Sequence, residues 1–305
     1  MIDLHLQKRL QEFVSSAKSP LIVILGPTAS GKTGFSIELA QKLGNVEIIN
    51  ADSRQLYRHL DIGTAKITPE EMQGIPHHLI DVLDPTQEVT AAWYRDEAMK
   101  TIDAIHVRGN VPVLVGGSML YISAIIDGLA FPVASDPALR KKLSDEYDAD
   151  EGVSLHARLA EIDPDTAQGL PRQNKPYVIR AMELHELGGK KPTDLREKAD
   201  CPYDLFIIGI ERSREELVKR IDKRTVQLLT GGWIGEVRGL IAKGYKADDP
   251  GMKSHGYREI MQAITSGNTD IEALAHIIAA KTRQYAKRQM TWWKGDERIN
   301  WISLK

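Results

Sequence analysis

The feature that most constrains this chain is a glycine-rich segment, GPTASGKT, at residues 26–33. It satisfies the pattern G-x-x-x-x-G-K-[ST], which is typical of phosphate-binding loops. A short apolar run precedes it, Leu21–Leu25, and predicts a strand that is buried on both faces. A helical pattern follows it, Lys32–Leu43. The strand–loop–helix context favours a cradle for a diphosphate or triphosphate group over a chance glycine-rich turn.

Each part of this loop has a predicted task. Gly26 and Gly31 permit the backbone conformations that turn successive N–H groups inward. Lys32 supplies a cation for phosphate oxygens at the positive end of the helix. The Thr33 hydroxyl is a predicted ligand of the Mg²⁺ that accompanies a diphosphate. We therefore expect diphosphate contacts along the whole loop, at Gly26, Pro27, Thr28, Ala29, Ser30, Gly31, Lys32 and Thr33.

The rest of the chain alternates strands and helices around one all-helical stretch. The alternation predicts an α/β fold, with a P-loop NTPase-like parallel sheet flanked by helices. Residues 131–200 contain helical segments but no strand-like run. The simplest interpretation is a P-loop catalytic core, residues 1–130 and 201–305, with residues 131–200 as an inserted all-helical domain. The other expected elements are strands at Val46–Asn50, Val111–Val115, Asp204–Ile210 and Ile299–Ser303, and helices at Ala91–Val107, Met119–Ile126 and Tyr177–Leu187.

Composition excludes several classes of protein. With 305 residues, of which 42% are hydrophobic and 27% charged, the chain can bury a large core. A net charge of −2 means that any contact with nucleic acid comes from local basic patches. The single cysteine, Cys201, excludes an internal disulfide and a cysteine-rich zinc site. We expect a cytoplasmic protein, because no apolar stretch is long enough for a membrane helix and the N-terminus lacks a signal-peptide pattern.

A phosphate-binding loop by itself does not name a reaction. Motors and nucleotide hydrolases need a further acidic residue, at the end of a neighbouring strand, to hold Mg²⁺. Here the expected strand Val111–Val115 runs into Gly116-Gly117-Ser118, without Asp or Glu. This absence argues against an ATP-driven machine.

Two polar residues follow other expected strands. Asp52 follows the second strand, at the carboxyl end where open α/β sheets place their chemistry. A carboxylate there is a candidate base, and equally a candidate turn cap. Ser118 follows the third strand after two glycines, where its hydroxyl can contact a phosphate or cap a helix. From position alone both alternatives stay open for each residue.

Taken together, the motifs resemble one family. After GPTASGKT come ADSRQLY, DIGTAK, PHHLID, VLVGGSMLY and TRQYAKRQMTWW, which begin at residues 51, 61, 76, 113 and 282. This series is similar to that of the tRNA dimethylallyltransferases, also called tRNA isopentenyltransferases, in their shorter bacterial form. The resemblance extends from about Leu21 to Trp293.

The resemblance implies transfer of a five-carbon group from dimethylallyl diphosphate. The acceptor is the N6 amine of the adenine immediately 3′ of the anticodon in tRNA, which has to flip out of its stack. The loop then holds the departing diphosphate rather than ATP. Asp52 is implied as the base, with Lys32 and Ser118 as its catalytic partners and Mg²⁺ as the cofactor. A monomer is the family expectation.

The resemblance also implies that the helical insertion grips the anticodon stem-loop. The chain departs from the family pattern at Ser118 and Tyr177, where Thr and Arg are usual, and at Asn174, where Asp is usual. Tyr177 is expected either to stack on a base or to pack in the helical core. The implied tRNA contacts are Asp52, Ser53, Arg54, Gln55, Ser118, Arg140, Pro176, Tyr177, Val178, Ile179 and Arg180.

Basic and aromatic residues are interleaved near the C-terminus. Such a segment suits an RNA backbone, and it equally suits a surface helix whose aromatic face packs in the core. The nearby segment His255–Arg258 resembles a family turn close to the RNA. The interleaved residues are Lys281, Arg283, Tyr285, Lys287, Arg288, Trp292, Trp293 and Lys294.

Three alternative functions remain open. An enzyme that prenylates free adenine nucleotides would share the loop and Asp52, although such enzymes are generally shorter and lack the helical insertion. A P-loop kinase or NTPase would turn over ATP. A non-catalytic RNA-binding module would tolerate the loss of Asp52.

Overall fold

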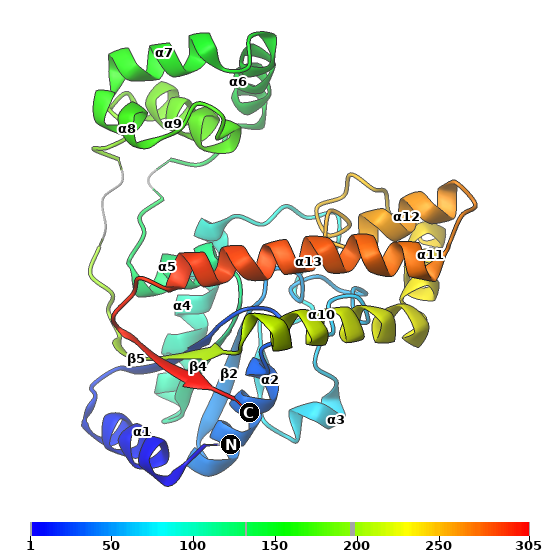
Figure 1. Cartoon of the computed structure of the whole chain (residues 1–305). Coiled ribbons are helices and arrows are strands. Elements are labelled where there is room, and N and C mark those ends of the chain that lie inside the picture. Colours follow the sequence, from blue (N-terminus) through cyan, green and yellow to red (C-terminus); the bar gives the residue numbers. More distant parts are fainter. Residues whose placement is uncertain (1, 132, 196–198, 305) are drawn as a thin grey trace. The chain divides into compact units, whose positions relative to one another are not determined.

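The computed structural model describes residues 2–131, 133–195 and 199–304. The chain divides into two compact units (Figure 1). The first unit consists of Met1–Ile126 together with Pro202–Lys305, and the second of Asp127–Cys201. The second unit is therefore an insertion in the sequence of the first.

The first unit is built on a six-stranded parallel sheet. Its strands are β1 (Pro20–Leu25), β2 (Val46–Ala51), β3 (His77–His78), β4 (Val111–Gly116), β5 (Asp204–Glu211) and β6 (Ile299–Ser303). Their order is β3-β2-β4-β1-β5-β6, which places β1 between β4 and β5. The prediction of a parallel α/β sheet is confirmed.

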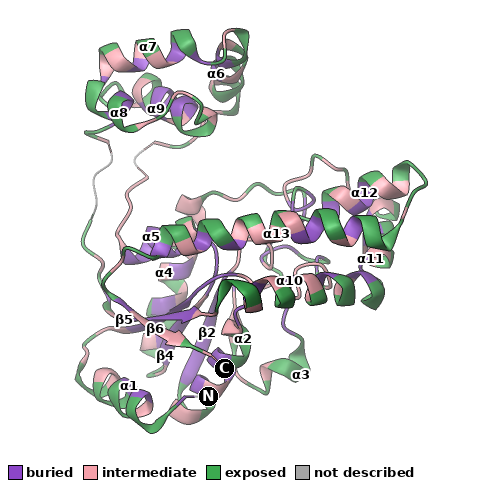
Figure 2. Cartoon of the chain, viewed as in Figure 1, coloured by how far each residue is buried: buried purple, intermediate pink, exposed green. Residues whose placement is uncertain are grey.

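The central strands of the sheet are buried. Leu21–Leu25 of β1 have no exposed surface, because the flanking helices cover the central strands (Figure 2). A strand that is buried on both faces needs apolar residues at every position rather than at alternate ones, which explains the run LIVIL. Ile22 of β1 fixes the register by pairing with Val113 of β4 and Phe206 of β5.

The helices of the first unit begin and end at sequence signals. The Thr90 side chain accepts a hydrogen bond from the Trp93 N–H and begins α4, and Gly44, with φ of +87°, ends α2. The helices are α1 (Leu4–Ser16), α2 (Lys32–Leu43), α3 (Pro69–Met72), α4 (Ala91–Val107), α5 (Met119–Ile126), α10 (Arg214–Leu228), α11 (Ile234–Ala242), α12 (Tyr257–Thr265) and α13 (Ile271–Trp293). The predicted bounds of α2, α4 and α5 match the structure. Among the described residues, no helix has the length and apolar character needed to cross a bilayer.

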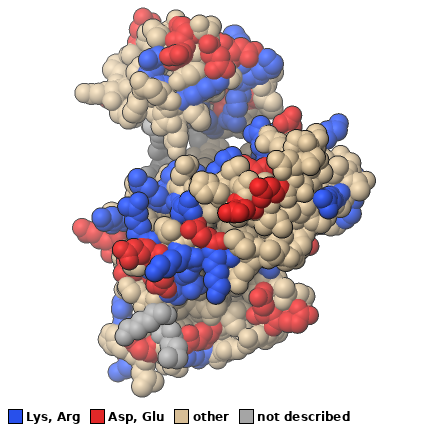
Figure 3. Space-filling model, turned by 45° about the vertical axis from the view of Figure 1, so that its right-hand side comes forward, with Lys and Arg blue, Asp and Glu red and all other residues tan. Residues whose placement is uncertain are grey.

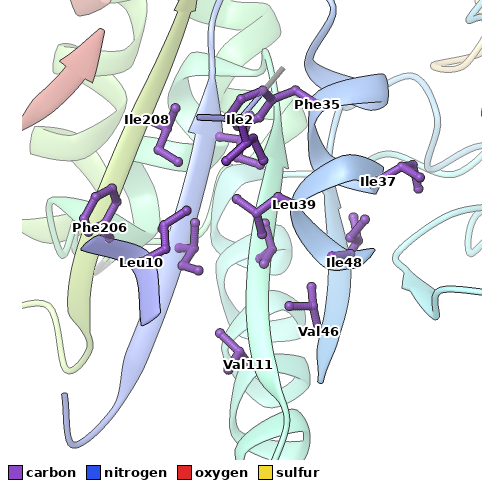
Figure 4. Packing of buried hydrophobic residues seen from close by; sticks show 14 of the residues in the cluster. Ile2, Leu10, Phe35, Ile37, Leu39, Val46, Ile48, Val111, Phe206 and Ile208 are labelled. Carbon is purple, nitrogen blue, oxygen red and sulfur yellow. The ribbon is translucent and has the colours of Figure 1, made fainter. Parts of the chain in front are cut away.

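Apolar side chains of α1 and α2 pack on the sheet. Figure 4 shows Leu10 of α1 and Leu39 of α2 in one cluster with Ile48, Val111 and Phe206 of the strands. All five are buried. This packing fixes where α2 begins, and therefore fixes the loop between β1 and α2.

The strand β3 was not predicted. Its two residues, His77 and His78, pair with Ile48 and Ile49 of β2. His78 Nε2 lies 2.6 Å from a carboxylate oxygen of Glu47. The Glu47 carboxylate is also bound by Arg108, whose hydrogen bonds are the main cause that lowers the pKa of Glu47 to about 2.

Within the described residues of the second unit, the named secondary-structure elements are all helices. Its helices are α6 (Pro137–Ala149), α7 (Val153–Ile162), α8 (Pro164–Gly169) and α9 (Lys175–Gly188). They share a core that includes Leu143, Leu155 and Val178. Asp163 ends α7 and begins α8, where it accepts hydrogen bonds from the N–H and hydroxyl groups of Thr166 and Thr193.

Candidate active site

The ends of three neighbouring strands form the base of the site. Because β1, β4 and β2 are adjacent and parallel, their carboxyl ends lie at the same edge of the sheet. The phosphate-binding loop follows β1, Asp52 follows β2, and Gly117-Ser118 follow β4. The sheet thus brings together the three catalytic residues that the sequence predicts, Lys32, Asp52 and Ser118.

The loop depends on its two glycines. Gly26 has φ of +143°, and a Cβ there would lie 2.4 Å from the carbonyl oxygen of Ile210. Gly31 has φ of +106°, which also disfavours a side chain. The backbone path of the loop therefore requires glycine at positions 26 and 31. The Ser30 hydroxyl is buried and has no hydrogen-bond partner within the described residues.

Lys32 lies at the first turn of α2 and bends back over the loop. Its Nζ donates hydrogen bonds to the carbonyl oxygens of Gly26, at 3.0 Å, and Pro27, at 2.8 Å. Burial is the main cause that lowers the pKa of Lys32 to about 8; Asp52 opposes this shift and Arg224 adds to it. The ammonium group is therefore charged at neutral pH and loses its proton in mildly alkaline solution.

Local hydrogen bonds between Asn50, Asp52 and Arg54 fix the turn at Asp52. The buried Asn50 side chain accepts from the Asp52 N–H and donates to the Asp52 carbonyl oxygen. Asp52 Oδ1 accepts the Arg54 N–H at 2.9 Å. Within the described residues, its other carboxylate oxygen has no hydrogen-bond partner. One oxygen therefore orients the side chain, and the second is available to accept a proton.

The Ser118 hydroxyl contributes to the same turn. Its Oγ accepts the Ser53 N–H at 2.8 Å, which ties the end of β4 to the residue after Asp52. The sequence left two roles open for this hydroxyl, a phosphate contact and a cap of its own helix. The hydrogen bond to Ser53 is neither of these. The structure places Ser118 as a support for the Asp52 turn.

Two cavities meet at Asp52. The larger, about 550 Å³, is lined by the loop residues Thr28 to Thr33 except Ser30, and by cationic side chains. The smaller, about 200 Å³, is lined by polar side chains such as Ser53 and Thr282 and by apolar and aromatic ones, including Ile221, Trp233 and Tyr285. Asp52 lines both. The carboxylate therefore stands between a polar, phosphate-binding space and a more apolar one.

Apart from Lys32, the Lys and Arg side chains of the larger cavity come from α10, which sequence reasoning missed. Arg220, Lys223 and Arg224 line the cavity together with Gln227. Their spacing of three and four residues places them on one face of the helix, and this periodicity was a signal in the sequence. Arg220 also donates to the carbonyl oxygen of Ala29 at 2.8 Å, which holds α10 against the loop.

The segment DIGTAK lies beside the Asp52 turn. Gln55 Nε2 donates to the carbonyl oxygens of Thr64 and Ala65. The Glu236 carboxylate of α11 accepts the N–H groups of Asp61 and Ile62, at 2.9 and 2.7 Å. These bonds hold the segment at the rim of both cavities, which Thr64 lines.

Some of the residues expected to contact RNA in the helical unit lie on its surface, and others lie in its core. Arg140 and Arg180 both donate to the buried carboxylate of Glu183, each at 2.7 Å. Tyr177 is 54% exposed, which excludes the alternative that it packs in the core. The side chains of Val178 and Ile179 are buried in the core, so the surface here is formed by Pro176, Tyr177 and the two arginines.

The basic and aromatic residues of α13 also differ in exposure, and some of them pair with other side chains. Trp293 is buried, whereas Trp292 is 43% exposed. Arg283 forms an ion pair with Asp222 of α10, and the guanidinium of Arg288 lies over the Tyr285 ring. Figure 3 shows groups of lysines and arginines on the surface with acidic side chains between them. The basic surface is therefore local, as the small net charge requires.

Comparison with known proteins agrees with this geometry. The family model described as IPP transferase matches residues 55–296. The chain belongs to the IPP transferase family. Among curated relatives of the family, the chain is 40% identical to a tRNA dimethylallyltransferase of Geobacter sulfurreducens and 42% identical to one of Pelotomaculum thermopropionicum. The alignments cover 94% of this chain and 93% and 92% of those relatives.

Solved structures of the family share the fold. The full-length tRNA isopentenylpyrophosphate transferase of Bacillus halodurans is 38% identical, with a TM-score of 0.69, over 94% of this chain and 90% of that one. A eukaryotic dimethylallyltransferase, in structures that describe it acting on tRNA, is 28% identical, with a TM-score of 0.78. That alignment covers 94% of this chain and 74% of the eukaryotic one. The resemblance read from the motifs is confirmed.

Proposed function

We propose that this chain transfers the dimethylallyl group of dimethylallyl diphosphate to the N6 amine of the adenine immediately 3′ of the anticodon in tRNA. The observation that carries the proposal is the position of Asp52, at the junction of a cation-lined cavity beside the phosphate loop and a more apolar cavity. A diphosphate suits the first cavity, and a prenyl chain with a flipped adenine suits the second.

The groups at this junction account for the bond that forms, the bond that breaks and the proton that is lost. The N6 nitrogen attacks the first carbon of the prenyl group, and the bond from that carbon to the diphosphate oxygen breaks. The electron pair of that bond leaves with the diphosphate, where Lys32, Arg220 and Arg224 stabilise the added charge. The amine loses a proton to the unpaired carboxylate oxygen of Asp52.

A divalent metal fits this site as a companion of the substrate. Within the described residues, no group of three or more His, Cys, Asp or Glu side chains is placed to hold a metal ion. Mg²⁺ commonly binds through one or two protein oxygens, with phosphate oxygens and water completing its shell. Thr33 lines the cavity and supplies one such oxygen. When bound there, Mg²⁺ would neutralise part of the charge on the diphosphate.

The helical unit would contribute affinity for the RNA. The partly exposed guanidinium groups of Arg140 and Arg180 are fixed by Glu183 and suit phosphate oxygens. Pro176 and the exposed Tyr177 lie beside them. We assign these residues, together with the Asp52–Gln55 turn, to the tRNA-binding surface.

The test is a direct comparison of acceptors. The protein is incubated with radiolabelled dimethylallyl diphosphate and Mg²⁺, and with either an anticodon stem-loop that carries adenine at the 3′ neighbour of the anticodon, the same stem-loop with guanine there, or AMP. Transfer to the adenine stem-loop alone is expected. Transfer to AMP with none to RNA, or ATP hydrolysis without prenyl transfer, would contradict the proposal.

A further inference from the structure

A buried amide of α13 joins two of the strand ends at the site. Gln289 is 1% exposed and lies in the second half of the helix. Its Oε1 accepts the backbone N–H of Thr28 in the phosphate loop at 2.9 Å. Its Nε2 donates to the carbonyl oxygen of Gly117 at 2.7 Å. The same side chain therefore bridges the loop after β1 and the turn after β4.

The turn after β4 is shaped to receive this amide. A Cβ on Gly117 would lie 2.2 Å from Gln289 Nε2, so a glycine is needed for the two groups to approach. Tyr285, one helical turn earlier, donates its hydroxyl to the same Gly117 carbonyl oxygen at 3.2 Å. Two residues on one face of α13 thus converge on a single carbonyl group.

A further hydrogen bond links the turn after β4 to the turn that carries Asp52. Ser118 follows Gly117, and its hydroxyl accepts the N–H of Ser53, the neighbour of Asp52. A path of three hydrogen bonds therefore runs from Thr28 through Gln289 to the Asp52 turn. Thr28 and Asp52 both line the two cavities, so this path spans the junction where the prenyl bond would break.

We propose that Gln289 is a positioning residue that holds the diphosphate loop and the Asp52 turn at a fixed separation. This inference rests on the proposed prenyl transfer. It also changes the assignment of one loop group, since the Thr28 N–H is committed to Gln289 instead of to the diphosphate. An amide is required because one end must accept and the other must donate.

The test compares three substitutions on the same helix. Gln289→Met removes both hydrogen bonds at similar volume, and Gln289→Glu keeps the acceptor for Thr28 but loses the donor to Gly117. Gln284→Met is the matched control, because the Gln284 side chain is exposed and makes no hydrogen bond within the described residues. Thermal melting identifies the variants that remain folded. Single-turnover kinetics measures the prenyl-transfer step, and amide hydrogen exchange follows the peptide that contains residues 26–33.

We expect Gln289→Met to slow the transfer step by about 10- to 100-fold, because misplacement of reacting groups by about 1 Å can cost that much. Gln289→Glu is expected to fall between Gln289→Met and the native chain. The affinities for dimethylallyl diphosphate and for the stem-loop should stay within about threefold, since neither ligand loses a contact. Exchange in residues 26–33 should accelerate in Gln289→Met and stay unchanged in Gln284→Met.

Three results would overturn the inference. The first is a folded Gln289→Met variant with native transfer and native exchange. The second is a loss of diphosphate affinity with an unchanged transfer step, which would make Gln289 a binding contact. The third is a failure of both Gln289 variants to fold, which would make the residue purely structural. If the native chain transfers no prenyl group, the proposed function fails, and the exchange comparison still decides whether Gln289 holds the loop.

Discussion

At the scale of single residues, the turn that carries Asp52 and the phosphate loop are held by hydrogen bonds to residues from other elements. Asp52 was singled out because it immediately follows an expected strand, and Lys32 because it belongs to the phosphate-loop motif between an expected strand and helix. The hydrogen bond from Ser53 to Ser118 and the bridge through Gln289 join residues far apart in the chain. No local pattern encodes such contacts, since they depend on which strands become neighbours in the sheet.

Asp52 gives the most direct prediction. Asp52→Asn preserves the shape of the turn but removes the carboxylate that accepts the amine proton. We expect the rate of prenyl transfer to fall by about 10²- to 10⁴-fold, the usual contribution of a general base. The affinity for the stem-loop, measured by filter binding, should change by less than about threefold. The exposed Asp248 provides a matched control, and Asp248→Asn should behave like the native chain. An Asp52→Asn variant with native turnover would remove Asp52 from the mechanism.

The lowered pKa of Lys32 leads us to expect that the activity depends on pH. Its pKa is lowered to about 8, mainly by burial, so the charged form that binds phosphate decreases as the pH rises through this value. The ratio kcat/KM for dimethylallyl diphosphate, which reports the free enzyme, should therefore fall about tenfold per pH unit above pH 8. In Lys32→Arg the guanidinium stays charged, and the residual activity should be flat over the same range. A native profile that stays level well above pH 8 would argue against this role.

At the scale of elements, the hydrophobic pattern of the sequence explains which strands and helix features were predicted and which were missed. The strands β1, β4 and β5 were predicted because continuous apolar runs of several residues are distinctive. The two-residue strand β3 was missed because His77-His78 has no apolar pattern. The charges of α10 were missed because a polar helix face looks the same in the sequence whether it lines a cavity or meets solvent.

The contact between α11 and the DIGTAK segment gives a prediction at this scale. Glu236 accepts the N–H groups of Asp61, Ile62 and Gly63 and the hydroxyl of Tyr257. Glu236→Ala should lower the free energy of unfolding by about 2–3 kcal/mol, because it removes the acceptor of several partly buried donors. Glu236→Gln should cost less, since it retains one acceptor oxygen. Chemical denaturation measures both, with the exposed Glu161→Ala as the control. Equal stabilities for all three variants would contradict this role of Glu236.

At the scale of the whole molecule, charge is organised locally and not globally. The sequence gives a net charge of −2, yet cations collect beside the phosphate loop and on the helical unit. Composition could predict that basic patches are needed for an RNA substrate, but not where they lie. The pairing of Arg140 and Arg180 through Glu183 became visible only once α6 and α9 were packed together.

Salt dependence tests the assignment of that arginine pair. The logarithm of the affinity for the stem-loop should fall linearly with the logarithm of the salt concentration. Arg140→Gln and Arg180→Gln should each reduce the slope by about one, as expected for one lost phosphate contact. Arg158, which pairs with Glu146 and Glu186 in the same unit, is the control, and Arg158→Gln should leave the slope unchanged. Unchanged slopes in all three variants would place the RNA elsewhere.

The two glycines that end β4 also restrict what this fold can become. A Cβ on Gly116 would lie 2.1 Å from the carbonyl oxygen of Ala51, and one on Gly117 would meet the amide of Gln289. At Gly116, the acidic residue with which nucleotide hydrolases hold their metal at a strand end therefore has no room unless β2 moves. At Gly117 it would fit only if the Gln289 side chain shifted and gave up its bridge between the two strand ends. An engineer who wished to add nucleotide hydrolysis here would have to move a strand or break the contact that holds the phosphate loop.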